Sequence, residues 1–118
     1  MFEVQDASPR IGSTIRITKA DMLAGTHAEE IKRLLPLRSA LAFPGMHFTD
    51  EEQVQFASTI GEVFKVAGDE LQNISMDPKV NRTADYTRGA FYWHIDGAND
   101  DTPAKATTLS ARILADGD

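Results

Sequence analysis

His94 and Asp96, separated by Ile95, are the residues of this sequence whose types and spacing best suit metal binding. Side chains two apart on a strand point to the same side, so both can reach one ion. A His-x-Asp pair supplies two of the three protein ligands in the two-histidine, one-carboxylate arrangement, which leaves other coordination positions open. The spacing therefore predicts a divalent-metal site whose third ligand comes from elsewhere.

Spacing by itself is weak evidence, because 3 histidines and 18 acidic residues in 118 yield about half of one such pair by chance. The sequence contains a second pair, His27 and Glu29. Glu29 has a simpler role there, since Thr26 and Glu29 have the spacing of a capping box at a helix start. Residues two apart on a helix also do not share a face. The second pair is therefore not expected to bind metal.

An aromatic run distinguishes the surroundings of His94. Aromatic side chains beside a few convergent polar groups are typical of small-molecule pockets. We expect substrate contacts from four residues near the pair: Tyr86, Phe91, Tyr92 and Asn99. Trp93 is expected to pack beneath the strand, and His47, beside a turn, to be exposed. The alternative is a half-buried strand in which His94 and Asp96 only hydrogen-bond each other or the backbone.

Composition narrows the function classes. The chain has room for one domain, its 42% hydrophobic and 25% charged residues are ordinary for a soluble protein, and the cytoplasm is its expected location. The net charge of −6 with scattered Lys and Arg argues against nucleic-acid binding. No stretch is long and apolar enough for a membrane span. The absence of cysteine excludes disulfides, thiolate metal sites and cysteine nucleophiles.

The elements expected to position the pair are short strands and two capped helices, which makes the fold class α+β. One helix begins at Thr26 and is limited by Pro36; the other begins with the Thr49 and Glu52 capping box and can end at Gly61 in a left-handed conformation. Alternating or apolar runs predict strands at 11–18, 39–43, 71–76, 91–95 and 105–114, with a loop at 79–89.

The order of these features resembles the N-terminal half of the TauD/TfdA family of iron(II)- and 2-oxoglutarate-dependent dioxygenases. Phe43-Pro44-Gly45 is followed by the helix start at Thr49 and then by Ile60-Gly61-Glu62. Trp93-His94-Ile95-Asp96 is similar to the family's Trp-His-x-Asp metal motif. Thr102-Pro103 and the strand expected after it resemble the family's segment downstream of that motif. The resemblance covers roughly residues 11 to 118.

The resemblance implies that His94 and Asp96 bind Fe(II), with 2-oxoglutarate as co-substrate. It implies oxidation of a small organic substrate by O₂ with release of succinate and CO₂, and no further catalytic residue is assigned. The implied fold is the N-terminal part of a double-stranded β-helix, a jelly-roll or cupin-like fold with flanking helices, so residues 1–118 are expected to form a single partial domain. A homo-oligomer is compatible with the sequence.

The sequence also departs from the family pattern. No histidine follows Asp96, so the second histidine ligand and the arginine that binds 2-oxoglutarate are not assigned, and the chain alone is expected to be inactive. Val66 and Ala90 stand where taurine oxidisers carry polar groups, which argues against taurine. Two other functions stay open: a non-catalytic binding module with a structural His94–Asp96 pair, and a metal-dependent hydrolase that would also use Asp100 or Asp101.

Overall fold

A computed structural model describes residues 1–66, 68–75, 77–81 and 92–113. The chain divides into two compact units, which are described separately. Unit 1 comprises residues 1–63 with 108–118, and unit 2 comprises residues 64–107. All of the named helices and strands lie in unit 1. Among the described residues, no helix has the length and apolar character that crossing a membrane would require.

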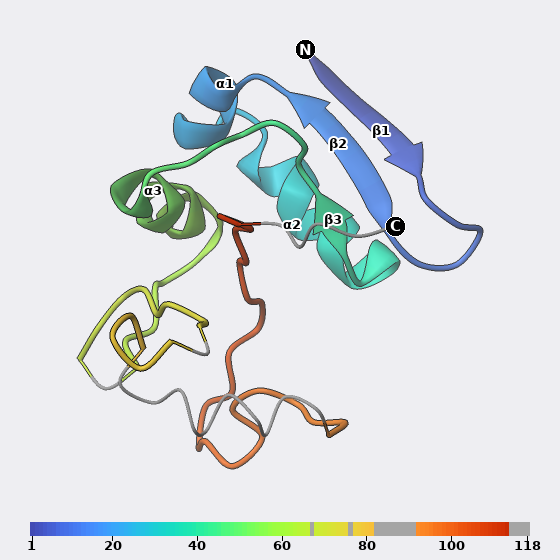
Figure 1. Cartoon of the computed structure of the whole chain (residues 1–118). Coiled ribbons are helices and arrows are strands. Elements are labelled where there is room, and N and C mark those ends of the chain that lie inside the picture. Colours follow the sequence, from blue (N-terminus) through green and yellow to red (C-terminus); the bar gives the residue numbers. More distant parts are fainter. Residues whose placement is uncertain (67, 76, 82–91, 114–118) are drawn as a thin grey trace. The chain divides into compact units, whose positions relative to one another are not determined.

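Unit 1 contains a three-stranded sheet in the order β1-β2-β3 (Figure 1). β1 (Phe2–Asp6) pairs antiparallel with β2 (Ser13–Ile17), and β2 pairs parallel with β3 (Leu41–Ala42). Alternate residues of β2 are buried, beginning at Ser13, because successive side chains point to opposite faces of the sheet. This confirms the strand predicted at 11–18. The prediction at 39–43 is confirmed only for the two residues of β3.

Helix α3 (Asp50–Ile60) begins at the predicted capping box. Thr49 Oγ1 accepts the Glu52 N–H at 3.2 Å, and Glu52 Oε2 accepts the Thr49 N–H at 2.8 Å. The Glu52 N–H lies in the first turn of α3 and the Thr49 N–H lies just before it, so neither has a partner within the helix. The capping box satisfies both groups. The predicted left-handed end at Gly61 is wrong, because its backbone is extended with φ 180°.

Helices α1 (Lys19–Leu23) and α2 (Ala28–Arg38) correct the prediction for this region. The N-cap of α2 is His27 and not Thr26, whose N–H instead donates to the Asp21 carbonyl oxygen at the end of α1. Pro36 lies inside α2 and does not end it. A proline in the last turn removes one hydrogen bond, and the helix still closes through the Ser39 N–H, which donates to the Leu35 carbonyl oxygen at 2.7 Å.

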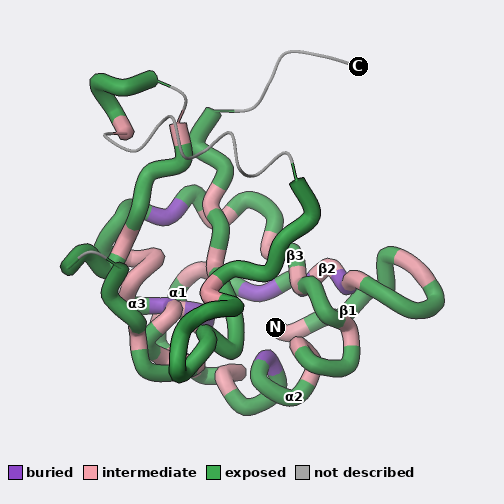
Figure 2. Tube along the Cα trace, turned by 90° about the horizontal axis from the view of Figure 1, so that it is seen from below, coloured by how far each residue is buried: buried purple, intermediate pink, exposed green. Residues whose placement is uncertain are grey.

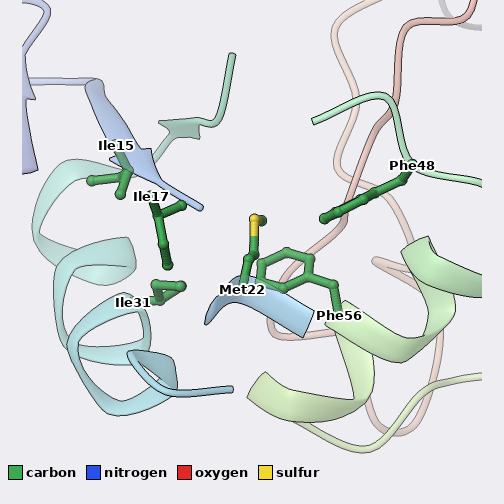
Figure 3. Close-up of a cluster of buried hydrophobic side chains, with 6 residues drawn as sticks. All are labelled: Ile15, Ile17, Met22, Ile31, Phe48 and Phe56. Atoms are coloured by element: carbon green, nitrogen blue, oxygen red, sulfur yellow. The ribbon is translucent and has the colours of Figure 1, made fainter. Parts of the chain in front are cut away.

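The core of unit 1 lies between the sheet and the helices. Figure 3 shows Ile15 and Ile17 of β2 directed toward α2, with Met22 of α1 between them and the aromatic side chains. The buried hydrophobic residues are Ile15, Ile17, Met22, Ile31, Phe48 and Phe56. Figure 2 shows the same distribution, with buried positions on β2, α2 and α3. Of the apolar residues of α3, Val54, Ala57 and Ile60 are only partly buried, and Phe56 is the buried one.

The strands expected later in the chain are wrong for the residues that the structure describes. Residues 71–75, 92–95 and 105–113 form no strand. Apolar side chains in these segments stay exposed, Ile74 to 71%, Ile95 to 80% and Ile113 to 93%. A strand needs a neighbour to pair its N–H and C=O groups, and apolar alternation does not supply one. The α+β class is observed, whereas a double-stranded β-helix is not seen in the described part.

Candidate metal centre

A tight turn follows the His94–Asp96 pair in unit 2. The Asp100 N–H donates to the Gly97 carbonyl oxygen at 3.0 Å, and the Ala98 N–H lies 3.4 Å from the Ile95 carbonyl oxygen. Gly97 has φ +66°, and a Cβ there would come within 2.8 Å of the Asp100 carboxylate. Glycine is therefore favoured immediately after the pair, because other residues rarely adopt this backbone conformation and a Cβ would displace the Asp100 carboxylate.

The structure brings the side chains of His94 and Asp96 together. His94 Nε2 lies 3.1 Å from Asp96 Oδ1. The other ring nitrogen, Nδ1, lies 2.7 Å from the Tyr92 carbonyl oxygen. A carbonyl oxygen only accepts hydrogen bonds, so this contact places a proton on Nδ1. In the neutral ring, Nε2 then keeps the lone pair that a metal requires.

The spacing of the two donor atoms suits a metal ion. Metal–ligand distances of about 2.1 Å at right angles separate neighbouring ligand atoms by about 3.0 Å. The observed separation of 3.1 Å is close to that value. A histidine that binds metal usually donates its second N–H to a carboxylate or backbone carbonyl, as Nδ1 does toward Tyr92. The same 3.1 Å is also the length of an ordinary N–H···O hydrogen bond. The contacts of the pair are therefore compatible with two neighbouring metal ligands and equally with the alternative, in which His94 and Asp96 only bond each other and the backbone.

Both side chains are accessible. The exposed fraction is 49% for His94 and 70% for Asp96. A contact between two side chains this exposed contributes little to folding stability, because water screens it. Among the described residues, no group of three or more His, Asp or Glu side chains is placed to hold one metal ion. Asp100 and Asp101 are therefore not gathered with the pair.

The predicted substrate residues divide into two sets. Tyr92, 78% exposed, and Asn99, also exposed, lie on either side of the pair in sequence. Tyr86 and Phe91 lie outside the described residues. Trp93 is fully exposed, so the expectation that it packs beneath a strand is wrong in this structure. Its indole has no strand to cover, because 92–95 is irregular.

The second pair separates as expected. His27 Nδ1 lies 3.8 Å from Glu30 and its ring stacks on Phe2, with centroids 4.6 Å apart. Glu29 instead pairs with Lys32 at 2.7 Å. His27 and Glu29 thus have different partners, as residues two apart at a helix start do. His47 is exposed, as predicted.

Sequence reasoning missed the roles of three residues. Tyr92 contacts His94 through its backbone carbonyl oxygen, and a backbone contact cannot be predicted from the type of side chain. Thr108 and Arg112, in unit 1, lie in the segment predicted as a strand at 105–114, and that prediction did not indicate their contacts with α3 and Phe48. Arg112 instead donates to the Phe48 carbonyl oxygen and pairs with Asp50 at 2.8 Å.

The comparison with known proteins gives the same family that the Trp93-His94-Ile95-Asp96 motif resembles. A profile of the family described as taurine catabolism dioxygenase TauD, TfdA family, matches residues 3–117. An alpha-ketoglutarate-dependent 2,4-dichlorophenoxyacetate dioxygenase of Cupriavidus pinatubonensis is 30% identical over 112 residues, which cover 80% of this chain and 39% of the relative. The chain thus spans about two fifths of that relative's length. No solved structure matches the chain. The profile match over nearly the whole chain shows that this protein belongs to the TauD/TfdA family of dioxygenases.

Proposed function

We propose that this chain supplies the His-x-Asp part of an iron(II) site in a 2-oxoglutarate-dependent dioxygenase that oxidises a small organic substrate. The observation that carries the proposal is the arrangement of His94 Nε2 and Asp96 Oδ1, 3.1 Å apart, within a member of a dioxygenase family. The name of the relative, which specifies alpha-ketoglutarate dependence, supports the same co-substrate here.

The overall reaction consumes 2-oxoglutarate, O₂ and a substrate C–H bond, and it yields succinate, CO₂ and, for a hydroxylation, the hydroxylated product. Bound iron(II) would supply the activation of O₂. The chain's own part is to present the two donor atoms and to hold the imidazole in one tautomer. The Tyr92 carbonyl does the latter by accepting the Nδ1–H of His94.

A third ligand and a cationic partner for 2-oxoglutarate complete the proposed site. Two histidines and one carboxylate are the usual set for this chemistry, and no histidine follows Asp96 in these 118 residues. We infer that both groups come from residues outside this sequence. They would also supply the strands that complete a jelly-roll fold around the exposed apolar side chains of 92–95. The 118 residues by themselves are then a partial domain without turnover.

The test is an anaerobic iron(II) titration in the presence of 2-oxoglutarate, followed through the visible charge-transfer band of the chelate. It is run on this chain and on any longer native product. We expect a band in the longer product that disappears in His94→Ala and in Asp96→Ala. His27→Ala is the matched control, because it removes the histidine of the other His-x-acid pair and should leave the band.

The second step measures succinate release with candidate substrates. A phenoxyacetate is the first choice because of the relative's name, and taurine is the comparison.

The iron titration has two outcomes that count against the proposal. The absence of a band in wild-type protein, both in this chain and in any longer product, would refute the iron site and favour a binding module. A band that survives His94→Ala would refute the assignment of the ligand.

A further inference from the structure

A clamp within unit 1 joins residues 108–112 to the start of α3. Gln53 Nε2 donates to the Thr108 carbonyl oxygen at 3.3 Å. The Arg112 guanidinium donates to the Phe48 carbonyl oxygen and, at 2.8 Å, to Asp50 Oδ1. Phe48 is a buried core residue, 6% exposed, so the clamp is attached to the core.

The clamp attaches the C-terminal end of the segment that carries the candidate metal ligands to unit 1. The chain leaves α3 after Ile60, and residues 108–112 return to the opposite end of the same helix. In sequence, unit 2 (residues 64–107) lies between these two attachments and contains both His94 and Asp96. A segment fixed at both ends has fewer conformations than one fixed at a single end.

Arg112 makes the strongest contacts of this clamp. Its planar guanidinium donates to a backbone carbonyl and a carboxylate together, in a geometry that a lysine ammonium does not reproduce. Its side chain is 44% exposed, so its packing contributes little to the core. The contacts between Gln53 and Thr108, at 3.3 and 3.5 Å, are longer.

We propose that Arg112 is a positioning residue that limits the conformations of the iron-binding segment. This inference rests on the proposed function. Arg112 touches neither candidate ligand, and it acts by holding the end of the segment on unit 1. Its loss should therefore weaken iron binding without changing the ligand atoms.

The first arm of the test measures position without metal. The chain has no cysteine, so spin labels introduced through Arg33→Cys on α2 and Leu109→Cys between Thr108 and Arg112, both in unit 1, are the only labelled sites. We expect the distribution of distances between the labels to broaden at least twofold in Arg112→Met. Lys32→Met is the matched control, since it removes an exposed ion pair of 2.7 Å on α2, and it should leave the distribution unchanged.

The second arm titrates iron(II) with 2-oxoglutarate in this chain and in any longer native product that gives the charge-transfer band. Arg112→Met should raise the apparent Kd for iron by up to about tenfold, because iron binding would then also have to restrict the released segment, and the free energy of one hydrogen bond to a charged group sets the upper limit. The band itself should keep its wavelength, because the ligands are unchanged. Arg112→Lys, which keeps the charge near Asp50, should recover part of the affinity.

The two failures are distinguishable. No band in wild-type protein overturns the proposed function and, with it, the role of Arg112 at iron. A normal wild-type band with an unchanged distance distribution in Arg112→Met overturns only the inference. An equal iron affinity in wild type and Arg112→Met overturns it as well, even if the distribution broadens.

Discussion

Arg38, the last residue of α2, ties the loop between β1 and β2 to the helix. Its Nη2 donates to the carbonyl oxygens of Ser8 at 2.6 Å and Gly12 at 2.8 Å, and its Nε donates to Ser13 Oγ at 2.9 Å. Asp6 lies 3.3 Å from the same guanidinium, whose side chain is only 13% exposed. We predict that Arg38→Met destabilises unit 1 by about 3 kcal/mol.

The magnitude follows from the number of contacts and from the bonds that remain after the substitution. Hydrogen bonds to charged groups contribute about 1.5–3 kcal/mol each, so three close ones set an upper limit well above the predicted loss. The loss is smaller than the summed contributions of the three hydrogen bonds, because two of the acceptors keep another partner. Ser13 Oγ still bonds Asp6, and the Gly12 carbonyl oxygen still accepts the Ala7 N–H. Arg38→Lys should lose about half as much, since one ammonium replaces the guanidinium fork.

The assay is urea unfolding followed by circular dichroism, with the free energy of unfolding compared among variants. Lys32→Met is the control, because its exposed pair with Glu29 should contribute less than about 0.5 kcal/mol. A loss below about 1 kcal/mol for Arg38→Met would refute the reasoning. So would equal losses for Arg38→Met and the control.

Three further predictions concern the helices and the core of unit 1. Thr49→Ala should lower the free energy of unfolding by about 1 kcal/mol, because it removes the cap of α3; an unchanged urea midpoint would contradict this. Phe56→Ala should cost about 3–5 kcal/mol, because this 5%-exposed ring contacts Phe43 and Phe48; a smaller loss, measured in the same way, would mean that the core repacks. Hydrogen bonds from Lys19 and from the Thr49 backbone lower the pKa of Glu52 below its ordinary 4.5. The folded state therefore favours the ionised form, so this contribution is complete above pH 4.5 and is lost as the pH falls through the lowered pKa. Glu52→Gln should flatten that acid dependence of the urea midpoint, and an identical acid profile in the variant would argue against the assignment.

Predictions based on neighbours in sequence were the most accurate. The capping box at Thr49 and the alternation of β2 both involve residues two or three apart, whose geometry is set once the backbone is helical or extended. The same pattern at Thr26 was misleading. Its N–H is taken by the Asp21 carbonyl oxygen of α1, a helix that the sequence did not indicate. β1 was missed as well, because four of its five residues are exposed and it is a strand through its pairing with β2.

Sequence alone was enough to identify the family, because a motif and its order in the chain can be recognised before any fold is known. The preference for His94 and Asp96 over His27 and Glu29 as the metal pair stays a prediction. Only the tertiary structure decided which atoms meet: Nδ1 of His94 with the Tyr92 carbonyl oxygen, and Nε2 with Asp96. It also decided the partners of Arg112, which lie more than 60 residues away in the sequence. Local patterns reflect backbone geometry over a few residues, whereas the partner of a long, charged side chain depends on where distant segments come together when the core closes.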